Sequence, residues 1–331
     1  YFILNWNNIV YIFKFTNMKE KISIVFMGTA DFAVPSLKAL AQSELFNVLA
    51  VVTQPDRLAG RKKILTPPPI KSAALELGLN VLQPEKVSEI KSDLTDFKAV
   101  VFVVVAYGQI LPQEILDIPE KGVINVHGSL LPKYRGASPI QEALLSREKE
   151  TGVTIMMMDE KMDHGDILKT GTIEISKNET SETLSNKLSV LGANVLTDTL
   201  PKVASEEIMP QVQDHEQATY TKKIIKESGR IDWSKSAQEI EAMIRAYTPW
   251  PHAYTFDHNN ERVIIHEATV VKCPDELAVG SFFITEEVLF GIVCGDSTAL
   301  EIKKIQKSGR PVLDAKSFLN GVSYSAGFIF E

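Results

Sequence analysis

The sequence predicts an α/β fold built on an open, mostly parallel sheet, followed by a second, smaller domain of short strands. Two observations predict the first part. Short apolar runs alternate with helix-like segments from Met18 onward, and some of these runs are apolar throughout. A run such as VVFVVV suits a strand buried on both faces, because crossover helices cover both sides of a parallel sheet. The length of 331 residues is natural for two domains.

Four strand-like runs precede residue 130, with helical segments such as VPSLKALAQS between them. The runs are KISIVFMG, NVLAVVT, KAVVFVVVAYG and GVINVHG. This alternation is typical of a Rossmann-like, doubly wound sheet, in which ligands bind beyond the carboxyl ends of the strands. Past Gly152, the stretch TGVTIMMMDEKMDHGDILKTGTIEI predicts two more strands around an acidic turn.

The second half of the chain begins after a loose, polar and basic stretch. Residues 207–225 are predicted to be a linker between a first domain at 18–206 and a second at 226–331. The second domain opens with a helix whose apolar residues recur at helical spacing, namely Ala237, Ile240, Ile244 and Tyr247. The short strand-like runs RVIIHEATVV, SFFIT, VLFGIVCG and ALEIKKIQ follow it and predict a small, OB-like β-barrel.

Composition and charge indicate an ordinary soluble globular protein of the cytoplasm. Hydrophobic residues make up 44% of the chain and charged residues 23%, and the net charge is -7. This charge argues against a surface that binds nucleic acid everywhere, but it allows a local basic patch. Cys273 and Cys294 lack the spacing of a zinc site or a disulfide framework. Residues 1–17 are apolar but short and interrupted by Asn and Lys, so we expect a non-native or disordered extension and no membrane association.

Asn125 and His127 stand at the end of a predicted strand, and a polar turn follows later in the chain. Acyl transfer to an amine needs hydrogen-bond donors for an oxygen that becomes negative and a base for the proton of the amine. Asn and His supply donors, and Asp supplies the acceptor. The turn contains four titratable side chains, namely Asp159, Asp163, His164 and Asp166.

Other interpretations of these residues stay open at this point. Asp163 to Gly165 could form only an Asx turn. A metal site made by His127 and the turn lacks helical His spacing, and we expect no metal. The turn at 28–31 has one glycine where a dinucleotide fingerprint has three, so we expect no nicotinamide cofactor. Ser129 lacks the G-x-S-x-G elbow, which makes a serine hydrolase the weaker hypothesis.

The run N-V-H-G-S-L-L-P at 125–132, with Tyr134-Arg135-Gly136 and then Asp163, closely resembles the folate-dependent formyltransferases. The resemblance implies 10-formyltetrahydrofolate as the formyl donor. It assigns Asn125 and His127 to the formyl oxygen, and Asp163 to proton movement and to keeping His127 charged or oriented. It also implies that the folate site is lined by two segments, namely Ser129, Leu130, Leu131 and Pro132, and Tyr107, Gln109, Ile110 and Leu111.

The second half resembles those members of the family that formylate methionine esterified to initiator tRNA, for translation initiation. The pieces ESGRIDWSKSAQEI, IRAYTPWPHAY and FLNG carry this resemblance, although the ending VSYSAGFIFE is less basic than the pattern. The segment TQPDRLAGRKKILTPPPIK at 53–71 resembles their tRNA-reading insertion. From 54 to 71 it has five basic residues against Asp56 alone. The implied tRNA contacts are Arg57, Arg61, Lys62 and Lys63.

The resemblance leaves two alternatives to this function. The chain could formylate a small amine such as an amino sugar nucleotide, or it could be a catalytically silent RNA-binding protein on the same scaffold. The intact Asn125, His127 and Asp163 set argues against the silent protein. A monomer with initiator methionyl-tRNA and folate as its partners is the expected state.

Overall fold

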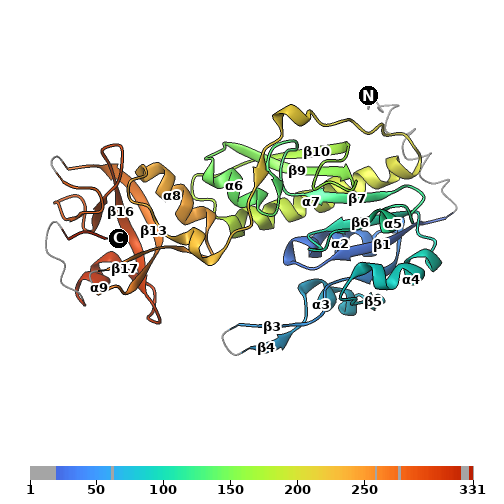
Figure 1. Cartoon of the computed structure of the whole chain (residues 1–331), viewed down its shortest axis with the longest axis horizontal. Coiled ribbons are helices and arrows are strands. Elements are labelled where there is room, and N and C mark those ends of the chain that lie inside the picture. Colours follow the sequence, from blue (N-terminus) through green and yellow to red (C-terminus); the bar gives the residue numbers. More distant parts are fainter. Residues whose placement is uncertain (1–19, 61–62, 258, 275–276, 322–327, 331) are drawn as a thin grey trace, which may run out of the picture. The chain divides into compact units, whose positions relative to one another are not determined.

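The computed structural model describes residues 20–60, 63–257, 259–274, 277–321 and 328–330 (Figure 1). The predicted extension at 1–17 lies outside the described residues. So do Arg61, Lys62 and most of the atypical ending.

The first half of the chain is organised around a seven-stranded sheet with the order β10-β9-β7-β6-β1-β2-β5. The five strands from β7 to β5 pair in parallel, and β9 pairs antiparallel to β7. The strands are β1 (Ile22–Gly28), β2 (Phe46–Val52), β5 (Val81–Leu82), β6 (Val101–Val105), β7 (Val123–His127), β9 (Glu150–Met157) and β10 (Ile167–Glu174). The predicted mostly parallel α/β sheet is confirmed.

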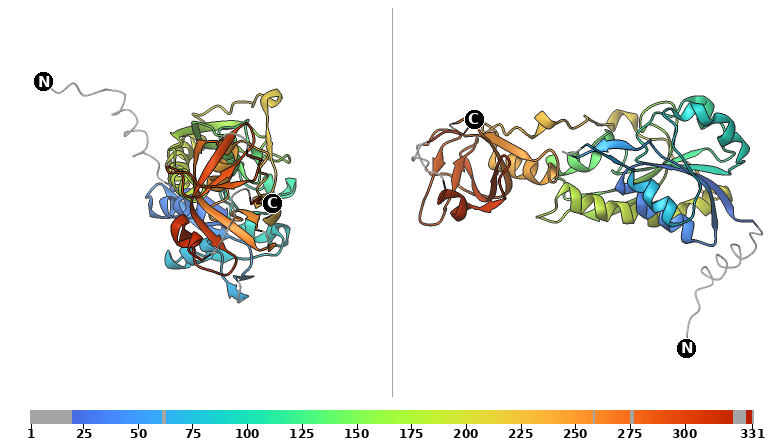
Figure 2. Two further views of the ribbon diagram at one scale, coloured as in Figure 1. Left: turned by 90° about the vertical axis from the view of Figure 1, so that its left-hand side faces the viewer. Right: turned by 90° about the horizontal axis from the view of Figure 1, so that it is seen from below.

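Helices cover both faces of this sheet (Figures 1 and 2). Alternate residues of a strand point to opposite faces, so Phe26 joins a core that includes Leu37 of α2, whereas Met27 joins one that includes Ile115 of α5. Every residue of β6 is buried, as its unbroken apolar run predicts. The helical segments are η1 (Asp31–Ala33), α2 (Val34–Gln42), α3 (Pro69–Glu76), η2 (Val87–Ile90), α4 (Lys91–Asp96), α5 (Gln113–Leu116), α6 (Pro139–Leu145) and α7 (Ser181–Ala204).

The last third of the chain forms a separate antiparallel sheet with its own core. Helix α8 (Ala237–Ala246) buries Ala237, Ile240 and Ile244 against this sheet, as the helical spacing predicts. Ser236 caps the helix, because its hydroxyl accepts a hydrogen bond from the backbone N–H of Glu239. The remaining elements are β12 (Ala253–Phe256), β13 (Arg262–Lys272), β14 (Phe282–Phe283), β15 (Gly291–Val293), β16 (Thr298–Lys307), β17 (Leu313–Asp314) and α9 (Ala315–Leu319). The sheet curves into a half-barrel, consistent with the predicted second domain.

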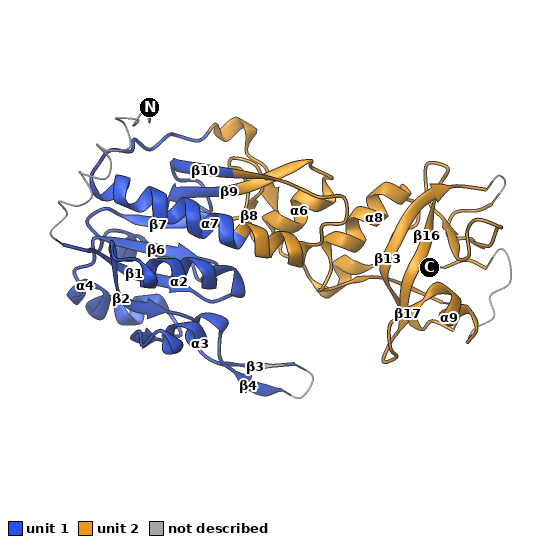
Figure 3. Cartoon of the chain, turned by 180° about the vertical axis from the view of Figure 1, so that it is seen from behind, with its two compact units in different colours: residues 1–127, 153–171, 189–213 blue, residues 128–152, 172–188, 214–331 orange. Residues whose placement is uncertain are grey.

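The chain divides into two compact units (Figure 3). Unit 1 comprises the described residues of 1–127, 153–171 and 189–213, and unit 2 comprises those of 128–152, 172–188 and 214–331. The chain therefore passes between the units several times. The domain boundaries expected from the sequence remain a prediction.

The basic loop at 53–71 contains a two-stranded hairpin that the sequence does not predict. Strands β3 (Arg57–Ala59) and β4 (Ile64–Thr66) pair antiparallel, with Arg57 opposite Thr66. The side chains of Leu58, Ile64 and Leu65 are more than half exposed. The hairpin therefore offers both apolar and basic groups to solvent.

The segment predicted to be a loose linker is hydrogen-bonded to the loop that follows β7. Strand β11 (Tyr220–Thr221) pairs in parallel with β8 (Arg135–Gly136), and the N–H of Arg135 donates to the carbonyl of Thr219 over 2.9 Å. The guanidinium of Arg135 is 1% exposed and lies 2.8 Å from Nδ1 of His215 and 3.3 Å from the hydroxyl of Tyr220. We call residues 214–221 the strap, because they close over Arg135.

Replacing Arg135 with Ala is expected to lower the free energy of unfolding by about 2–3 kcal/mol. The change removes a buried side chain together with its hydrogen bonds to the strap. Urea denaturation followed by circular dichroism measures the effect. Lys133→Ala in the same loop is the control, because its side chain is 57% exposed and little change is expected there. An Arg135→Ala protein as stable as the parent would show that the contacts of the guanidinium with the strap contribute no stability.

Candidate active site

Strand β7 places Asn125 and His127 on one face at the carboxyl end of the sheet. Residues two apart on a strand share a face. Asn125 pairs in register with Val104 of β6 and Met156 of β9, and His127 pairs with Thr154 of β9. The imidazole of His127 is 6% exposed, whereas Asn125 is half-buried. Both side chains therefore reach the edge at which such sheets bind ligands.

Asp163 lies beside His127, in the turn between β9 and β10. Its Oδ1 is 3.5 Å from Nδ1 of His127, and its side chain is 16% exposed. This distance is longer than the usual hydrogen bond but well within the range of an ion pair. The structure thus brings together the three residues that the sequence indicates as catalytic. The carboxylate is placed to orient the imidazole.

The turn that carries Asp163 contains a residue in the left-handed conformation, and a glycine and a side-chain contact hold its shape. Asp163 has φ of 50°, a left-handed conformation that Asp and Asn adopt more readily than most residues. A Cβ atom on Gly165 would lie 2.0 Å from the carbonyl oxygen of Met157, so only glycine fits there. His164 Nδ1 lies 2.6 Å from Asp159 Oδ2, which joins the two ends of the turn.

Gln213 is a supporting residue that the sequence does not reveal. Its side-chain amide is buried and donates to the carbonyl oxygens of Asp163 over 3.0 Å and Gly165 over 2.7 Å. It therefore holds the backbone of the turn that carries Asp163 from 50 residues away. In the sequence it stands within the polar stretch QVQDHEQ and shows no periodicity that would set it apart.

The expected folate residues of the loop after β6 occupy several environments. Tyr107 is 1% exposed, and burial raises its pKa to about 12. Among the described residues, its buried hydroxyl has no hydrogen-bond partner. Gln109 holds residues 85–87, because its amide donates to the carbonyl of Glu85 and accepts from the N–H of Val87. Ile110 is 83% exposed, and Leu111 is buried.

The expected folate residues at 129–132 follow β7 directly and begin unit 2. Ser129 is fully buried, and its hydroxyl donates to the carbonyl of Lys133 over 2.6 Å. Leu131 is 6% exposed, and Leu130 and Pro132 are half-buried. The carbonyl of Pro132 accepts a hydrogen bond from Thr219 of the strap. The loop is therefore fixed by its own residues and by the strap.

The predicted tRNA contacts lie on the β3–β4 hairpin, as far as the structure describes them. The guanidinium of Arg57 is 2.6 Å from Glu85, and both side chains are 62% exposed. Lys63 is also exposed. Lys71 is engaged with Asp56 over 2.8 Å, and Asp56 has a lowered pKa because Gln83 and then Lys71 hydrogen-bond to it. Two of the five basic side chains in residues 54–71, those of Arg57 and Lys71, are therefore paired with carboxylates.

Both halves of the chain match known protein families. Residues 20–200 match the formyl transferase family, and residues 223–323 match the formyl transferase C-terminal domain. A methionyl-tRNA formyltransferase of Caldanaerobacter subterraneus is 45% identical over 311 residues, which cover 93% of this chain and 99% of the relative. That of Bacillus subtilis is 43% identical over 307 residues, which cover 92% and 96%. The chain belongs to the methionyl-tRNA formyltransferase family.

Membership of this family confirms the formyltransferase resemblance and makes the chain a formyl-transferring enzyme. Solved structures add support for the fold. An N-formyltransferase of Helicobacter canadensis, in complex with folinic acid and dTDP-3-aminofucose, matches with a TM-score of 0.65 at 19% identity. The match covers 87% of this chain and all of that one. Within the described part of the chain, no three His, Cys, Asp or Glu side chains cluster as metal ligands would. None of the described helices has the length and apolar character that crossing a membrane requires.

Proposed function

We propose that this chain transfers the formyl group of 10-formyltetrahydrofolate to the free amino group of methionyl-tRNA for translation initiation. The contact between His127 and Asp163, with Asn125 on the same face, is the observation that carries the proposed chemistry. The similarity to methionyl-tRNA formyltransferases over more than 90% of the chain supports the acceptor.

The donor supplies an activated formyl carbon, and the side chains of β7 and the catalytic turn act on the groups around it. Asn125 and His127 donate hydrogen bonds to the formyl oxygen as the amine attacks and negative charge develops there. Asp163 orients the imidazole and accepts the proton that the amine loses. A new C–N bond to the amine forms, the C–N10 bond of the donor breaks, and N10 receives a proton. No covalent enzyme intermediate is needed.

The folate site is proposed to include the loop after β6 and residues 129–132. Gln109 contributes indirectly, since its amide groups hold residues 85–87. We also propose that the enzyme acts as a monomer in the cytoplasm, where charged tRNA is used.

A direct assay tests the function. The enzyme is incubated with 10-formyltetrahydrofolate and one of three acceptors, namely initiator methionyl-tRNA, an amino sugar nucleotide or free methionine. Formylation of methionyl-tRNA alone is expected. Faster formylation of the sugar nucleotide would favour the small-amine function, and formylation of no acceptor would favour a silent RNA-binding protein.

Removing the basic groups of the hairpin is expected to weaken tRNA use and leave folate binding intact. The variant replaces Arg57, Arg61, Lys62 and Lys63 with Ala. Each lost phosphate contact flattens the slope of log K against log salt by about 0.7 to 0.9. We expect KM for methionyl-tRNA to rise roughly tenfold or more, because several weak surface contacts are lost together.

KM values for both substrates, measured across a salt series, test this prediction. Lys91, which pairs with Glu114 over 2.8 Å, is an exposed cation away from the loop, and Lys91→Ala serves as the control. A fourfold variant that used methionyl-tRNA as well as the parent at physiological salt would remove the hairpin from the tRNA site.

A further inference from the structure

The buried side chain of Gln213 ends on the turn that carries Asp163, although it comes from a distant part of the sequence. Gln213 is 4% exposed, and it stands in the segment between the two family matches, which cover residues 20–200 and 223–323. Gln213 and the turn both belong to unit 1. A residue outside both matched domains is therefore bonded to the turn that holds one of the proposed catalytic groups.

A short backbone pairing brings Gln213 to this turn. The N–H of Ile167 donates to the carbonyl of Gln211, and the N–H of Gln211 donates to the carbonyl of Ile167, both over 2.8 Å. The pairing is antiparallel, so each step forward from Gln211 corresponds to a step back from Ile167. Gln213 therefore comes to lie opposite Gly165.

The side-chain amide of Gln213 matches two carbonyl oxygens of the turn. An amide nitrogen carries two N–H groups. The amide nitrogen of Gln213 donates to the carbonyl of Asp163 over 3.0 Å and to that of Gly165 over 2.7 Å. Gly165 is buried, and a buried carbonyl that loses its partner is costly. A side chain without a donor at position 213 would remove both bonds at once.

These bonds act on the residue whose carboxylate faces His127. Asp163 has φ of 50°, a conformation that the surrounding structure must hold for a residue with a side chain. The backbone of a residue sets the direction in which its side chain leaves the chain, so fixing the carbonyl of Asp163 also restricts its carboxylate. Oδ1 of that carboxylate lies 3.5 Å from Nδ1 of His127. Gln213 therefore helps to set this distance through the backbone.

We propose that Gln213 is a positioning residue for formyl transfer. It holds the carboxylate of Asp163 where it orients His127 and accepts the proton of the attacking amine. The proposal rests on the proposed function, which gives Asp163 that role. It assigns part of the geometry of the active site to the segment that follows the first matched domain. Loss of the amide is expected to slow the chemical step more than it weakens substrate binding.

The test is a kinetic cycle of four proteins, namely the parent, Gln213→Met, Asp163→Asn and the double variant. Met has nearly the length of Gln but donates no hydrogen bond. Gln213→Met is expected to lower kcat for methionyl-tRNA roughly tenfold, less than a misplacement of about 1 Å can cost, because other contacts of the turn remain. In the Asp163→Asn background the same change is expected to lower kcat less than about twofold, since the carboxylate that Gln213 positions is already gone.

The cycle separates positioning of Asp163 from a general structural role. Equal losses in the two backgrounds would overturn the proposal, because Gln213 would then act independently of Asp163. A Gln213→Met protein with the kcat of the parent would overturn it as well. Gln211→Met is the matched control and should keep the kcat of the parent, since Gln211 is exposed and pairs with Ile167 through its backbone. If Gln213→Met fails to fold, Gln213→Asn replaces it in the cycle, because its amide is one carbon too short to reach both carbonyls.

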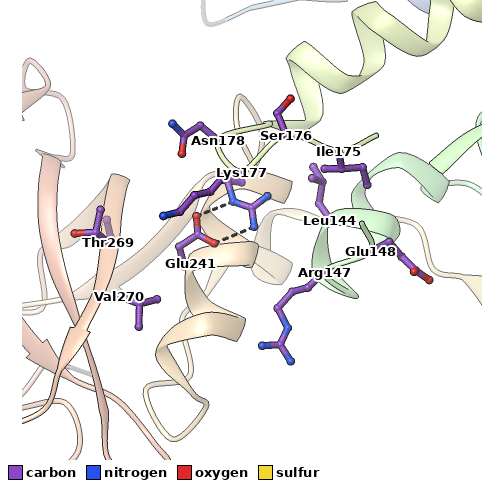
Figure 4. Close-up of a pocket in the computed structure, with 12 residues that line it drawn as sticks. Leu144, Arg147, Glu148, Ile175, Ser176, Lys177, Asn178, Glu241, Thr269 and Val270 are labelled. Atoms are coloured by element: carbon purple, nitrogen blue, oxygen red, sulfur yellow. Dashed lines mark hydrogen bonds and ion pairs between the residues drawn. The ribbon is translucent and has the colours of Figure 1, made fainter. Parts of the chain in front are cut away.

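Hydrogen–deuterium exchange of the protein without substrates measures the turn independently of any reaction. Faster exchange of the backbone N–H groups of residues 158–166 is expected in Gln213→Met. Arg245→Met is the control for lost stability. Arg245 lines a cavity in unit 2 and donates two hydrogen bonds to Glu241, of 2.7 and 2.9 Å (Figure 4). Exchange of the turn is expected to stay at the rate of the parent in that variant, and the same rise in both variants would overturn the proposal.

Failure of the proposed function and failure of this proposal give different results. If the parent formylates no acceptor while exchange of the turn rises in Gln213→Met alone, the proposed function is wrong and the positioning by Gln213 stands. If the parent formylates methionyl-tRNA while Gln213→Met matches it in kcat and in exchange, the function stands and the positioning role is wrong.

Discussion

Replacing Asp163 with Asn is expected to lower kcat at least about a hundredfold, while the fold and folate binding stay intact. A positioned acid-base group contributes on this scale. The carboxylate lies 3.5 Å from His127 Nδ1. The neutral amide that replaces it can neither accept the proton nor place a negative charge beside the imidazole. Asn is also the substitution that the backbone tolerates, because it adopts the left-handed conformation of this position readily.

Single-turnover kinetics with methionyl-tRNA, together with folate affinity and circular dichroism, measure this effect. Asp159→Asn is the matched control within the same turn. Its carboxylate pairs with His164 and is 40% exposed, so only a small loss of kcat is expected. If Asp163→Asn turned over at nearly the rate of the parent, or if both variants lost the same activity, Asp163 would be a residue that only shapes the turn.

Asn125→Ala and His127→Ala are each expected to cost about 3 kcal/mol of transition-state stabilisation, roughly a hundredfold in kcat. Each change removes one donor to the oxygen that becomes negative. Both donors act on one oxygen, so the double variant is expected to lose less than the sum of the two effects. The parent, both single variants and the double variant form a complete cycle of kcat measurements.

Burial of His127 makes a folding control necessary for this cycle. Its imidazole is 6% exposed, and Ala leaves a gap between β7 and β9. His127→Leu keeps more of the side-chain volume but has no hydrogen-bond donor, so it should restore stability without restoring activity. Strictly additive losses would contradict action on one oxygen. A single variant whose melting temperature collapsed along with its activity would assign the residue to folding.

The central sheet could be predicted from the sequence because its causes are local, and the same local pattern indicates Asn125 and His127 as candidate catalytic residues. The unbroken apolar run of β6 requires burial on both faces, and a period of two along β7 places Asn125 and His127 together. Asp163 is a candidate on the basis of the chemistry of its turn and the family resemblance, and its catalytic role stays a prediction. Its contact with His127 depends on the pairing of β7 with β9, which no local pattern specifies.

The parts that sequence reasoning missed depend on contacts between distant segments. Gln213 hydrogen-bonds to a turn 50 residues earlier, and its neighbours in the sequence give no indication of it. The contacts by which the side-chain amide of Gln109 holds residues 85–87 are likewise not visible in the sequence, and its place in the folate site stays a prediction. The polar composition at 207–225 suggested a free linker, yet its hydrogen-bond partners come from the loop after β7.

The strap over Arg135 determines where a chimera between this protein and a relative should be joined. The family match of the first domain ends at residue 200, but residues 214–221 supply the hydrogen bonds that enclose Arg135 and reach Pro132. A fragment ending at residue 200 would open that buried guanidinium to water. A chimera joined there would pair another relative's strap with its own residues 132–136. Grafts between relatives should therefore be joined after Thr221, so that the loop keeps the partner with which it folds.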